Sequence, residues 1–382
     1  MKIAWLGSIT TPEACKNNKA ISLASNYWQE SFIKALEDSS VRTTTISTLP
    51  HQAFPFGPLL VKPSANDFVS TNVLIHKYIN IKGLKNCSEA YGMQKSLKKI
   101  HKLDAVVSYN PYFPCRIAAA NFSKKHKLPW VEICADSVAS SPGWEILYNE
   151  KKIPDGFVFL SAEAFKRCPF DNKILIHGGI PDSLEYDERN FQDNVEDESD
   201  DSVSFLYSGS FEYWSGLNLI LKAFTNSTFN KTCELIICGY GKLSKEDQRL
   251  INNDNRIKFF GTVSKLELHD LRKKTQILVN PRPLIDENIF NFPSKLLEYM
   301  SYGKIIVSTK TPGIPSHFKE MMLLTSDNLS DFSNTLMHAS KMNANEKKPI
   351  LTKLTEYSKA HTWLYEVNRF LSFLKTLTQE TK

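Results

Sequence analysis

Residues 276–308 constrain the fold more than any other part of the chain, because they hold two strand-like runs joined through a helix. The apolar run 276–280 ends in a Pro-Arg-Pro turn, an amphipathic helix is predicted over 294–302, and a β-type run at 305–308 follows Gly303. Two such strands lie parallel in one sheet as a βαβ unit. Open α/β sheets bind ligands at the carboxyl ends of their strands, so the loop after 280 is a predicted ligand site.

The residues in this loop and helix suit a nucleotide that carries a diphosphate. The start of a helix offers backbone N–H groups and a positive dipole end. Arg282 and Lys295 add positive charge, and a lysine in the first turn opposes the helix dipole, which favours a functional reason for its place. Glu298, one turn further on, lies among apolar residues and would need a partner, for which a ribose diol is the best candidate.

Short strands and helices alternate along both halves of the chain, which predicts two parallel sheets built from βαβ units. In the first half, strands are predicted at 2–6, 43–47, 104–108, 130–134, 156–160 and 173–176, with helices at 24–37, 86–101 and 115–125. In the second half, strands are predicted at 202–207, 234–238, 257–260 and 276–280, with helices at 216–226 and 266–274. Residues 50–80 are predicted to be irregular, and the acidic stretch 187–201 to be an exposed connection.

Composition excludes several other classes of protein. A length of 382 residues suits two domains, and a net charge of +6 does not favour nucleic-acid binding. The densest basic cluster, 95–102, is interpreted as a solvated helix face or as a contact with an anionic membrane. Seven cysteines without a CxxC pair indicate free thiols in a reducing compartment. With neither a signal peptide nor a membrane span in the sequence, we expect a cytoplasmic protein, at most peripheral to the inner face of the cell membrane.

The sequence also lacks the common motifs of other enzyme classes. It contains no HExxH, no Gly-x-Ser-x-Gly elbow and no Walker sequence, and no Asp-x-Asp stands in a suitable loop. We therefore expect no bound metal and no cofactor beyond the donor substrate.

The block FPSKLLEYMSYGKIIVSTKTPG, residues 292–313, resembles the donor site of retaining glycosyltransferases of the GT-B architecture, specifically glycosyltransferase family 4, also called glycosyl transferases group 1. This resemblance implies an α/β fold in which two Rossmann-like domains with parallel sheets face each other across a cleft. It implies an N-terminal acceptor-side domain over 1–185, an acidic linker over 186–202 and a nucleotide-sugar domain over 203–355. A C-terminal helix, 356–382, would cross back to the first domain.

The resemblance assigns roles to individual residues. It implies catalytic roles for Lys295, Arg282 and Asp136, and acceptor contacts at Tyr109 and Asn110. The donor would contact Gly7, Ser8, Gly209, Ser210, Gly239, Val263, Glu287, Phe292, Pro293, Ser294 and Glu298. The alternative role of Asp136 is to cap the following segment. The alternative role of Gly239 is to form a tight turn, and Arg282 could instead be a solvated turn residue.

The chain departs from the family pattern at several places. Many members carry two Glu residues eight positions apart. Glu298 matches the second of these, and this chain has Phe290 at the position of the first. Glu287 is the candidate substitute for the missing Glu. Ser210 and Ser215 stand where relatives often have Arg and Lys. No His precedes Asp136, as it often does in relatives.

The function expected from this resemblance is metal-independent transfer of a hexose-type sugar, with retention, from a nucleoside diphosphate sugar to a hydroxyl of a glycan or lipid-linked glycan. Surface polysaccharide biosynthesis is the expected context. Two alternatives remain open: a non-catalytic relative that binds a sugar nucleotide or glycan, and a sugar-nucleotide epimerase of the same architecture.

Overall fold

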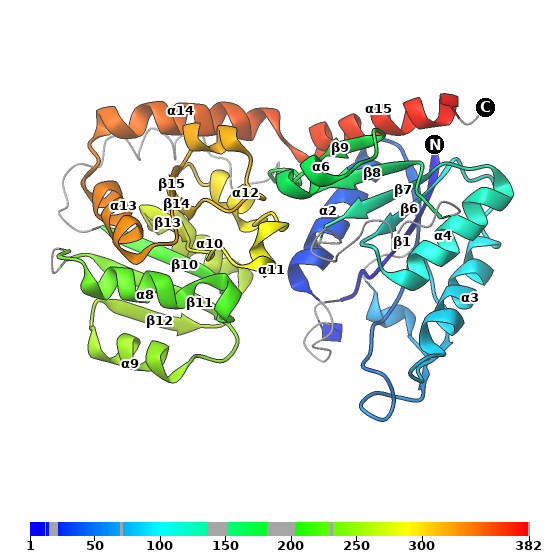
Figure 1. Ribbon diagram of the computed structural model, residues 1–382, viewed down its shortest axis with the longest axis horizontal. Helices are drawn as coiled ribbons and strands as arrows, with labels where there is room; N and C mark the ends of the chain where they lie inside the picture. Colours follow the sequence, from blue (N-terminus) through cyan, green and yellow to red (C-terminus); the bar gives the residue numbers. More distant parts are fainter. Residues whose placement is uncertain are drawn as a thin grey trace. The chain divides into compact units, whose positions relative to one another are not determined.

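The computed structural model describes residues 1–11, 13–14, 22–68, 72–135, 152–181, 203–229 and 232–380. The chain divides into two compact units (Figure 1). Unit 1 comprises Met1–Gly179 with Trp363–Lys382, and unit 2 comprises Ile180–Thr362. Both termini therefore belong to the same unit. The predicted linker, 186–202, lies outside the described residues.

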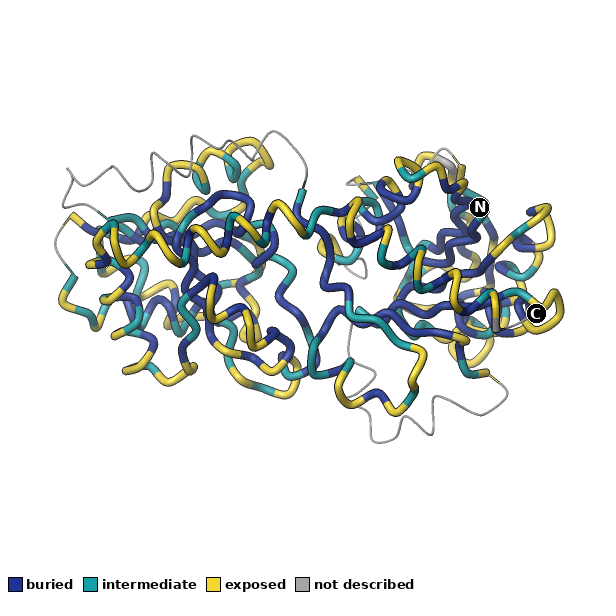
Figure 2. The backbone as a smooth tube through the Cα atoms, turned by 90° about the horizontal axis from the view of Figure 1, so that it is seen from above, coloured by how far each residue is buried: buried dark blue, intermediate teal, exposed yellow. Residues whose placement is uncertain are grey.

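Unit 1 is built on a parallel sheet of seven strands in the order β4-β2-β1-β6-β7-β8-β9. The strands are β1 (Lys2–Gly7), β2 (Arg42–Ser47), β4 (Val73–Leu74), β6 (Ala105–Tyr109), β7 (Trp130–Cys134), β8 (Gly156–Phe159) and β9 (Lys173–Leu175). The central strands are almost entirely buried, as expected for a parallel sheet covered on both faces, whereas the edge strands β4 and β9 are half-buried. Figure 2 shows how buried and exposed residues are distributed along the chain.

The stretch 50–80, predicted to be irregular, contains regular structure. β4 extends the large sheet beside β2, and β3 (Leu60–Val61) pairs antiparallel with β5 (Tyr78–Ile79) in a small second sheet. A short 3-10 helix, η1 (Ala65–Asp67), lies between them in sequence. Strands of two residues are too short to show a periodic pattern, which explains the wrong prediction.

The helices of unit 1 are α2 (Leu23–Asp38), α3 (Lys85–Leu97), α4 (Phe113–His126), α6 (Ala162–Arg167) and α15 (Trp363–Glu380). The last of these comes from the far end of the chain and packs on α2. The ring centroids of Trp363 and Trp28 lie 5.6 Å apart, and those of Phe370 and Phe32 lie 5.2 Å apart. Trp28 and Phe32 stack at 4.9 Å. All four side chains are buried, so the C-terminal helix completes the core of unit 1.

Unit 2 is built on a parallel sheet of six strands in the order β12-β11-β10-β13-β14-β15. The strands are β10 (Ser204–Ser210), β11 (Glu234–Tyr240), β12 (Ile257–Gly261), β13 (Ile277–Asn280), β14 (Ile305–Thr309) and β15 (Leu323–Thr325). The helices are α8 (Leu217–Asn226), α9 (Lys245–Asn253), α10 (Lys265–Lys274), α11 (Asp286–Ile289), α12 (Lys295–Met300), α13 (Leu329–Lys341) and α14 (Ala344–Ala360). Two 3-10 helices, η2 (Tyr213–Ser215) and η3 (Ser316–Glu320), complete the unit.

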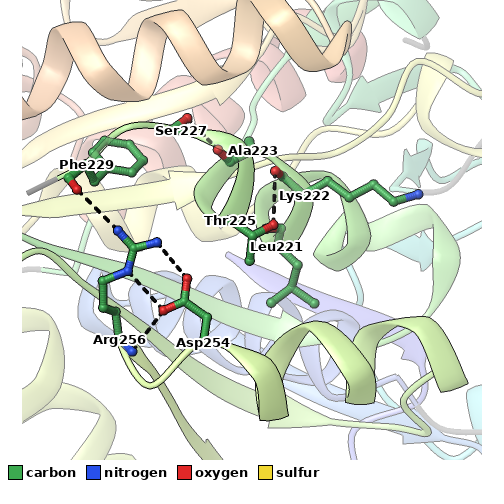
Figure 3. A network of polar contacts seen from close by, with 8 residues as sticks. All are labelled: Leu221, Lys222, Ala223, Thr225, Ser227, Phe229, Asp254 and Arg256. Atoms are coloured by element: carbon green, nitrogen blue, oxygen red, sulfur yellow. Dashed lines mark hydrogen bonds and ion pairs between the residues drawn. The ribbon is translucent and has the colours of Figure 1, made fainter. Parts of the chain in front are cut away.

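A partly buried ion pair lies in the loop before β12, and its arginine links this loop to the segment that follows α8 (Figure 3). The Arg256 guanidinium donates to both carboxylate oxygens of Asp254, at 2.9 and 2.6 Å, and to the carbonyl of Phe229 at 3.3 Å. It also lies 4.8 Å from the ring centroid of Phe224. Arg256 directly precedes β12, so this anchor stabilises the amino-end edge of the sheet, opposite the edge where a ligand is expected.

The strand order reverses once in each large sheet. β1 lies between β2 and β6, and β10 lies between β11 and β13, so successive strands are added first on one side and then on the other. Ligands of open α/β sheets bind where this reversal occurs. The ends of β1 and β6 in unit 1, and of β10 and β13 in unit 2, are therefore the places to examine for a site.

Gly216 allows the chain after β10 to touch the chain after β13. Its φ is +81°, and a Cβ at this position would lie 1.8 Å from the carbonyl oxygen of Pro281 and 3.2 Å from the backbone nitrogen of Arg282. Backbone atoms cannot move aside as a flexible side chain can. Glycine is therefore required here for its conformation and for its size.

Gly216→Ala is expected to destabilise the protein far more than Gly83→Ala. Gly83 has a similar φ, +89°, but nothing lies within 4 Å of its would-be Cβ. Both variants pay about 1–2 kcal/mol for the left-handed conformation, whereas the clash at Gly216 adds about 1–3 kcal/mol or more. Thermal unfolding of the two variants beside the parent measures the difference. Equal losses of Tm would contradict the close contact at Gly216.

Candidate functional site

Lys295 spans the gap between α12 and the end of β10. Its Nζ lies 2.5 Å from the point that a Cβ on Gly209 would occupy, and 5.0 Å from the ring centroid of Tyr207. The absence of a side chain at Gly209 leaves the space that the ammonium group fills. Two residues that were predicted to contact the donor, 86 positions apart in sequence, therefore lie side by side at the strand reversal of unit 2.

Positive charge is concentrated around this lysine. Burial lowers the pKa of Lys295 to about 7, the neighbouring positive charges of Arg282 and Arg272 lower it as well, and Glu298 opposes the shift. Arg282 directly follows Pro281 at the end of β13, and its carbonyl accepts a hydrogen bond from the hydroxyl of Thr309. Lys295 thus has two positive charges and one carboxylate as electrostatic neighbours, and Arg272 is paired with that carboxylate. Such a cluster suits an anionic ligand.

Glu298 has a partner within the protein. The guanidinium of Arg272, on α10, forms an ion pair with Glu298 Oε2 at 2.7 Å and lies over the rings of Tyr299 and Tyr302, at 5.6 and 5.7 Å from their centroids. The side chain of Glu298 is 33% exposed. Arg272 therefore balances the charge of Glu298, so this residue does not need a ligand as its partner, contrary to expectation. Its contact with a ribose stays a prediction.

The start of α12 differs from the predicted helix start. The helix spans Lys295–Met300 rather than 294–302, and Ser294 makes no side-chain capping bond. The N–H groups of Leu296 and Leu297 donate to the carbonyls of Pro293 and Ser294, at 2.9 and 3.1 Å. These tight first-turn bonds occupy groups that were expected to face a phosphate. At this helix start the side chain of Lys295 supplies a positive charge in addition to the remaining N–H groups.

Other predicted donor contacts lie in the loop between β13 and α12. Glu287, on α11, is exposed and accepts a hydrogen bond from the hydroxyl of Tyr213, which lowers the pKa of the Glu287 carboxyl. The side chain of Asn291 donates to the Glu287 carbonyl at 2.7 Å. Phe290, at the position of the missing family Glu, is buried, and so is Phe292, which packs edge-on against Phe318.

The end of β10 carries Ser210, whose hydroxyl oxygen accepts a hydrogen bond from the backbone N–H of Glu212 at 3.1 Å. Gly239, at the end of β11, pairs in register with Gly209, and a Cβ there would lie 1.7 Å from the Gly209 carbonyl oxygen. The hydroxyl of Thr262 donates to the Gly239 carbonyl at 3.1 Å. Val263 follows β12, two strands away from Gly209 along the same edge.

The predicted residues of unit 1 also cluster at a strand reversal. Gly7 ends β1 and Ser8 follows it. The side-chain amide of Gln29 donates to the Ser8 carbonyl at 3.0 Å. A Cβ on Gly7 would lie 2.1 Å from the side-chain oxygen of Gln29, so Gln29 packs against both residues. Tyr109 ends the neighbouring β6 and is buried, with Trp28 at 5.5 Å. Asn110 accepts a hydrogen bond from the N–H of Ala135 at 2.9 Å.

These contacts show packing and turn-stabilising roles for Tyr109 and Asn110, whereas their contact with an acceptor stays a prediction. Asp136 lies outside the described residues.

Sequence reasoning did not identify Arg272, Tyr207 or Tyr213. Arg272 lies in the basic last turn of α10, which resembles an ordinary surface stretch, and its partner Glu298 is 26 residues away. Such a contact forms only when β13 and α12 have folded against α10, so no local sequence pattern predicts it. Within the described ranges, no group of three or more His, Cys, Asp or Glu residues could hold a metal ion. Nor does any helix in these ranges combine the length and apolar character needed to cross a bilayer.

Comparison with known proteins places these features in a family context. Residues 188–350 match the family model described as "Glycosyl transferases group 1". The matched segment contains the unit 2 residues discussed above, from Gly209 to Glu298. A search of curated protein sequences finds no significant match.

Solved structures resemble the chain over nearly its whole length. The apo form of the lipopolysaccharide outer core galactosyltransferase WaaB aligns with a TM-score of 0.70 at 15% identity, covering 98% of this chain and 99% of that one. A glycosyltransferase from Rickettsia africae gives a TM-score of 0.71 at 13% identity, with 98% of each chain covered. Anabaena Alr3699/HepE in complex with UDP gives 0.64 at 14% identity, covering 98% and 100%. The chain thus has the α/β fold of GT-B glycosyltransferases, with two Rossmann-like domains, and its residues 188–350 match the Glycosyl transferases group 1 model.

Proposed function

We propose that the protein is a retaining glycosyltransferase that uses a nucleoside diphosphate sugar as donor. The observation that carries this proposal is the placement of the buried Lys295 against Gly209, with Arg282 as a neighbouring cation, at the strand reversal of the domain that matches the family model. Cations placed at such a reversal suit a diphosphate. Support also comes from Anabaena HepE, a protein of the same fold that was solved in complex with UDP.

The order of residues along the sheet edge matches the order of groups in such a donor. The nucleobase lies near Val263 at the end of β12, and the backbone turn at Gly239 follows on the next strand. The diphosphate lies against Gly209, Lys295 and Arg282. Adjacent strands are about 4.8 Å apart, so the base and diphosphate positions are separated by about 10 Å. Glu298 reaches the ribose while it keeps its ion pair with Arg272.

The chemistry of transfer requires stabilisation of the departing diphosphate. Its negative charge grows as the bond to the sugar breaks, and Lys295 and Arg282 are the residues that meet this charge. Fixed cations in this role make a metal ion unnecessary. Glu287, oriented by Tyr213, contacts the donor sugar in place of the family's missing Glu. The acceptor hydroxyl attacks from the same face as the leaving group departs and passes its proton to the departing diphosphate, which retains the anomeric configuration. For Asp136, the catalytic role implied by the resemblance is part of this proposal.

The acceptor is a hydroxyl of a glycan or lipid-linked glycan, contacted by the loop at Tyr109 and Asn110. The context is surface polysaccharide biosynthesis in the cytoplasm, at the inner face of the cell membrane. Support for this part comes from the similarity in fold to WaaB, whose name describes a lipopolysaccharide outer core galactosyltransferase.

Product analysis tests the proposed reaction. The full chain is incubated with a panel of nucleoside diphosphate sugars and glycan acceptors, with and without excess EDTA, and the products are identified by NMR. We expect a glycoside with the anomeric configuration of the donor, formed at the same rate in EDTA. Interconversion of the sugar nucleotide would instead identify an epimerase, and binding without turnover a non-catalytic relative. Activity lost in EDTA and restored by Mg²⁺ would contradict metal independence.

Proton uptake on nucleotide binding tests the environment of Lys295. Because its pKa in the free protein is lowered to about 7, the lysine is mostly neutral at pH 8. A bound diphosphate raises that pKa, so binding takes up a proton and the affinity falls as the pH rises above 7. Calorimetry of UDP, ADP and GDP binding in buffers of different ionisation enthalpy measures the number of protons taken up.

Lys295→Met should abolish the proton uptake. Arg282→Gln removes a neighbouring cation and so raises the pKa of Lys295 in the free protein, which should reduce the uptake at pH 8. Equal uptake by parent and Lys295→Met would rule out this role.

A double-mutant cycle tests whether Lys295 and Arg282 act on the same charge. Each of Lys295→Ala and Arg282→Ala should lower kcat more than it raises KM, by about 3–4 kcal/mol in activation free energy. The double variant should lose less than the sum, because both side chains meet one leaving group. Lys273→Ala, at an exposed position one residue beyond Arg272, is the control and should retain activity. Near-normal kinetics for Arg282→Ala would make that residue a solvated turn position.

A further inference from the structure

Large apolar side chains are exposed together on one part of unit 1. The face formed by Phe54, Leu60, Ile79 and Ile81, with Phe56 and Leu59 in the adjoining loop, is here called the β3–β5 face. Leu60 pairs with Ile79 and Phe54 bridges to Ile81, so these four residues are neighbours. Phe56 is 85% exposed, and the other five side chains are between 37% and 51% exposed. Soluble monomeric proteins rarely leave so many apolar side chains together in water unless something covers them.

The β3–β5 face is held in place by the protein beneath it. The opposite side of the small sheet is buried, with Val61 at 2% and Tyr78 at 1% exposure. The Asn80 side chain donates to the carbonyls of Gln52 and Pro58, at 2.7 and 2.9 Å, and its backbone bonds to Phe54 and Leu59. The exposed side chains are therefore presented by a fixed backbone rather than by a loose loop.

Basic residues continue from this face along α3. Leu84 precedes the helix, its N–H donates to the Ile81 carbonyl, and it is 57% exposed. Tyr91, 71% exposed, and then Lys95 and Lys98, also exposed, follow at spacings of seven, four and three residues, which place them on one side of a helix. An apolar stretch therefore passes directly into a lysine stripe.

The charge of this region accounts for the net charge of the protein. Residues 50–102 contain eight lysines and no arginine against two acidic residues, a net charge of +6, which equals that of the whole chain. One of the two acids, Glu89, is fully buried and accepts hydrogen bonds from Thr48 and Tyr112. The exposed surface of 50–102 is thus apolar and cationic, whereas the charges of the remaining residues cancel.

From this combination we propose that the β3–β5 face and the α3 lysines dock the protein on an anionic lipid bilayer. Exposed aliphatic and aromatic side chains enter the boundary between headgroups and acyl chains, while lysines bind lipid phosphates. A nucleic acid fits less well, because most of the exposed side chains here are aliphatic and cannot stack on bases. The docking does not rest on glycosyl transfer. It adds an apolar anchor to the basic cluster at 95–102, which alone could be a solvated helix face.

Vesicle flotation of the full chain tests this docking. Vesicles of phosphatidylcholine alone are compared with vesicles that contain an equal amount of phosphatidylglycerol, at low and high salt. We expect binding only to the anionic vesicles, weakened by high salt. The double variants Phe56→Ser/Leu59→Ser and Lys95→Glu/Lys98→Glu should each weaken binding about tenfold or more.

Matched controls carry the same chemical changes elsewhere. Leu266→Ser removes a leucine that is 71% exposed on α10, and Lys341→Glu/Lys348→Glu reverses two exposed lysines of unit 2. Both should bind vesicles as the parent does. All variants change exposed side chains, and circular dichroism checks that they are folded.

Failure of the parent to bind anionic vesicles at low salt would overturn the proposal. Equal binding by the patch variants and their controls would also overturn it. Sedimentation velocity measures a third outcome. A dimer that dissociates in Phe56→Ser/Leu59→Ser would show that a second copy of the chain covers the face instead of lipid.

Discussion

The backbone contact between Gly216 and Pro281 is the constraint on which the rest of the candidate site depends. It holds the chain after β10 against the chain after β13, at the reversal of strand order. Arg282 directly follows this contact, and Lys295, on the following helix, places its Nζ against Gly209. Burial, and after it the positive charges of Arg282 and Arg272, lower the pKa of Lys295, and a bound anion opposes this shift. Anion binding is thus coupled to the charge of a lysine that the fold keeps buried.

The parts of this structure that the sequence predicted are those with a local physical cause. Both parallel sheets were predicted, because buried parallel strands appear as short apolar runs. Lys295 and Arg282 were predicted at one edge because they follow β13 in the same βαβ unit. By contrast, β4 is too short to have a pattern, and Arg272 meets Glu298 only through tertiary packing. The N–H groups of Leu296 and Leu297 are used by a tight first turn that helix periodicity cannot show.

The sequence predicted that Glu298 needs a partner, but that partner is another residue of the protein. Its burial among apolar residues indicated that it needed a partner, and Arg272 provides one at 2.7 Å. The ion pair orients the carboxylate and leaves it partly exposed, which is the arrangement that a carboxylate needs to accept hydrogen bonds from hydroxyl groups. Arg272 in turn lies over Tyr299 and Tyr302, so the position of Glu298 depends on α10 as well as on its own helix.

The packing of α15 on α2 has a consequence for the order in which the chain can fold. Trp28 and Phe32 are synthesised before unit 2, whereas the rings that cover them, Trp363 and Phe370, are synthesised after it. Unit 1 therefore cannot complete its core until all of unit 2 has been translated, whereas unit 2 is contained in an uninterrupted stretch, Ile180–Thr362. The domain that is translated first is thus the one that finishes folding last, and during translation its aromatic surface is open to chaperones.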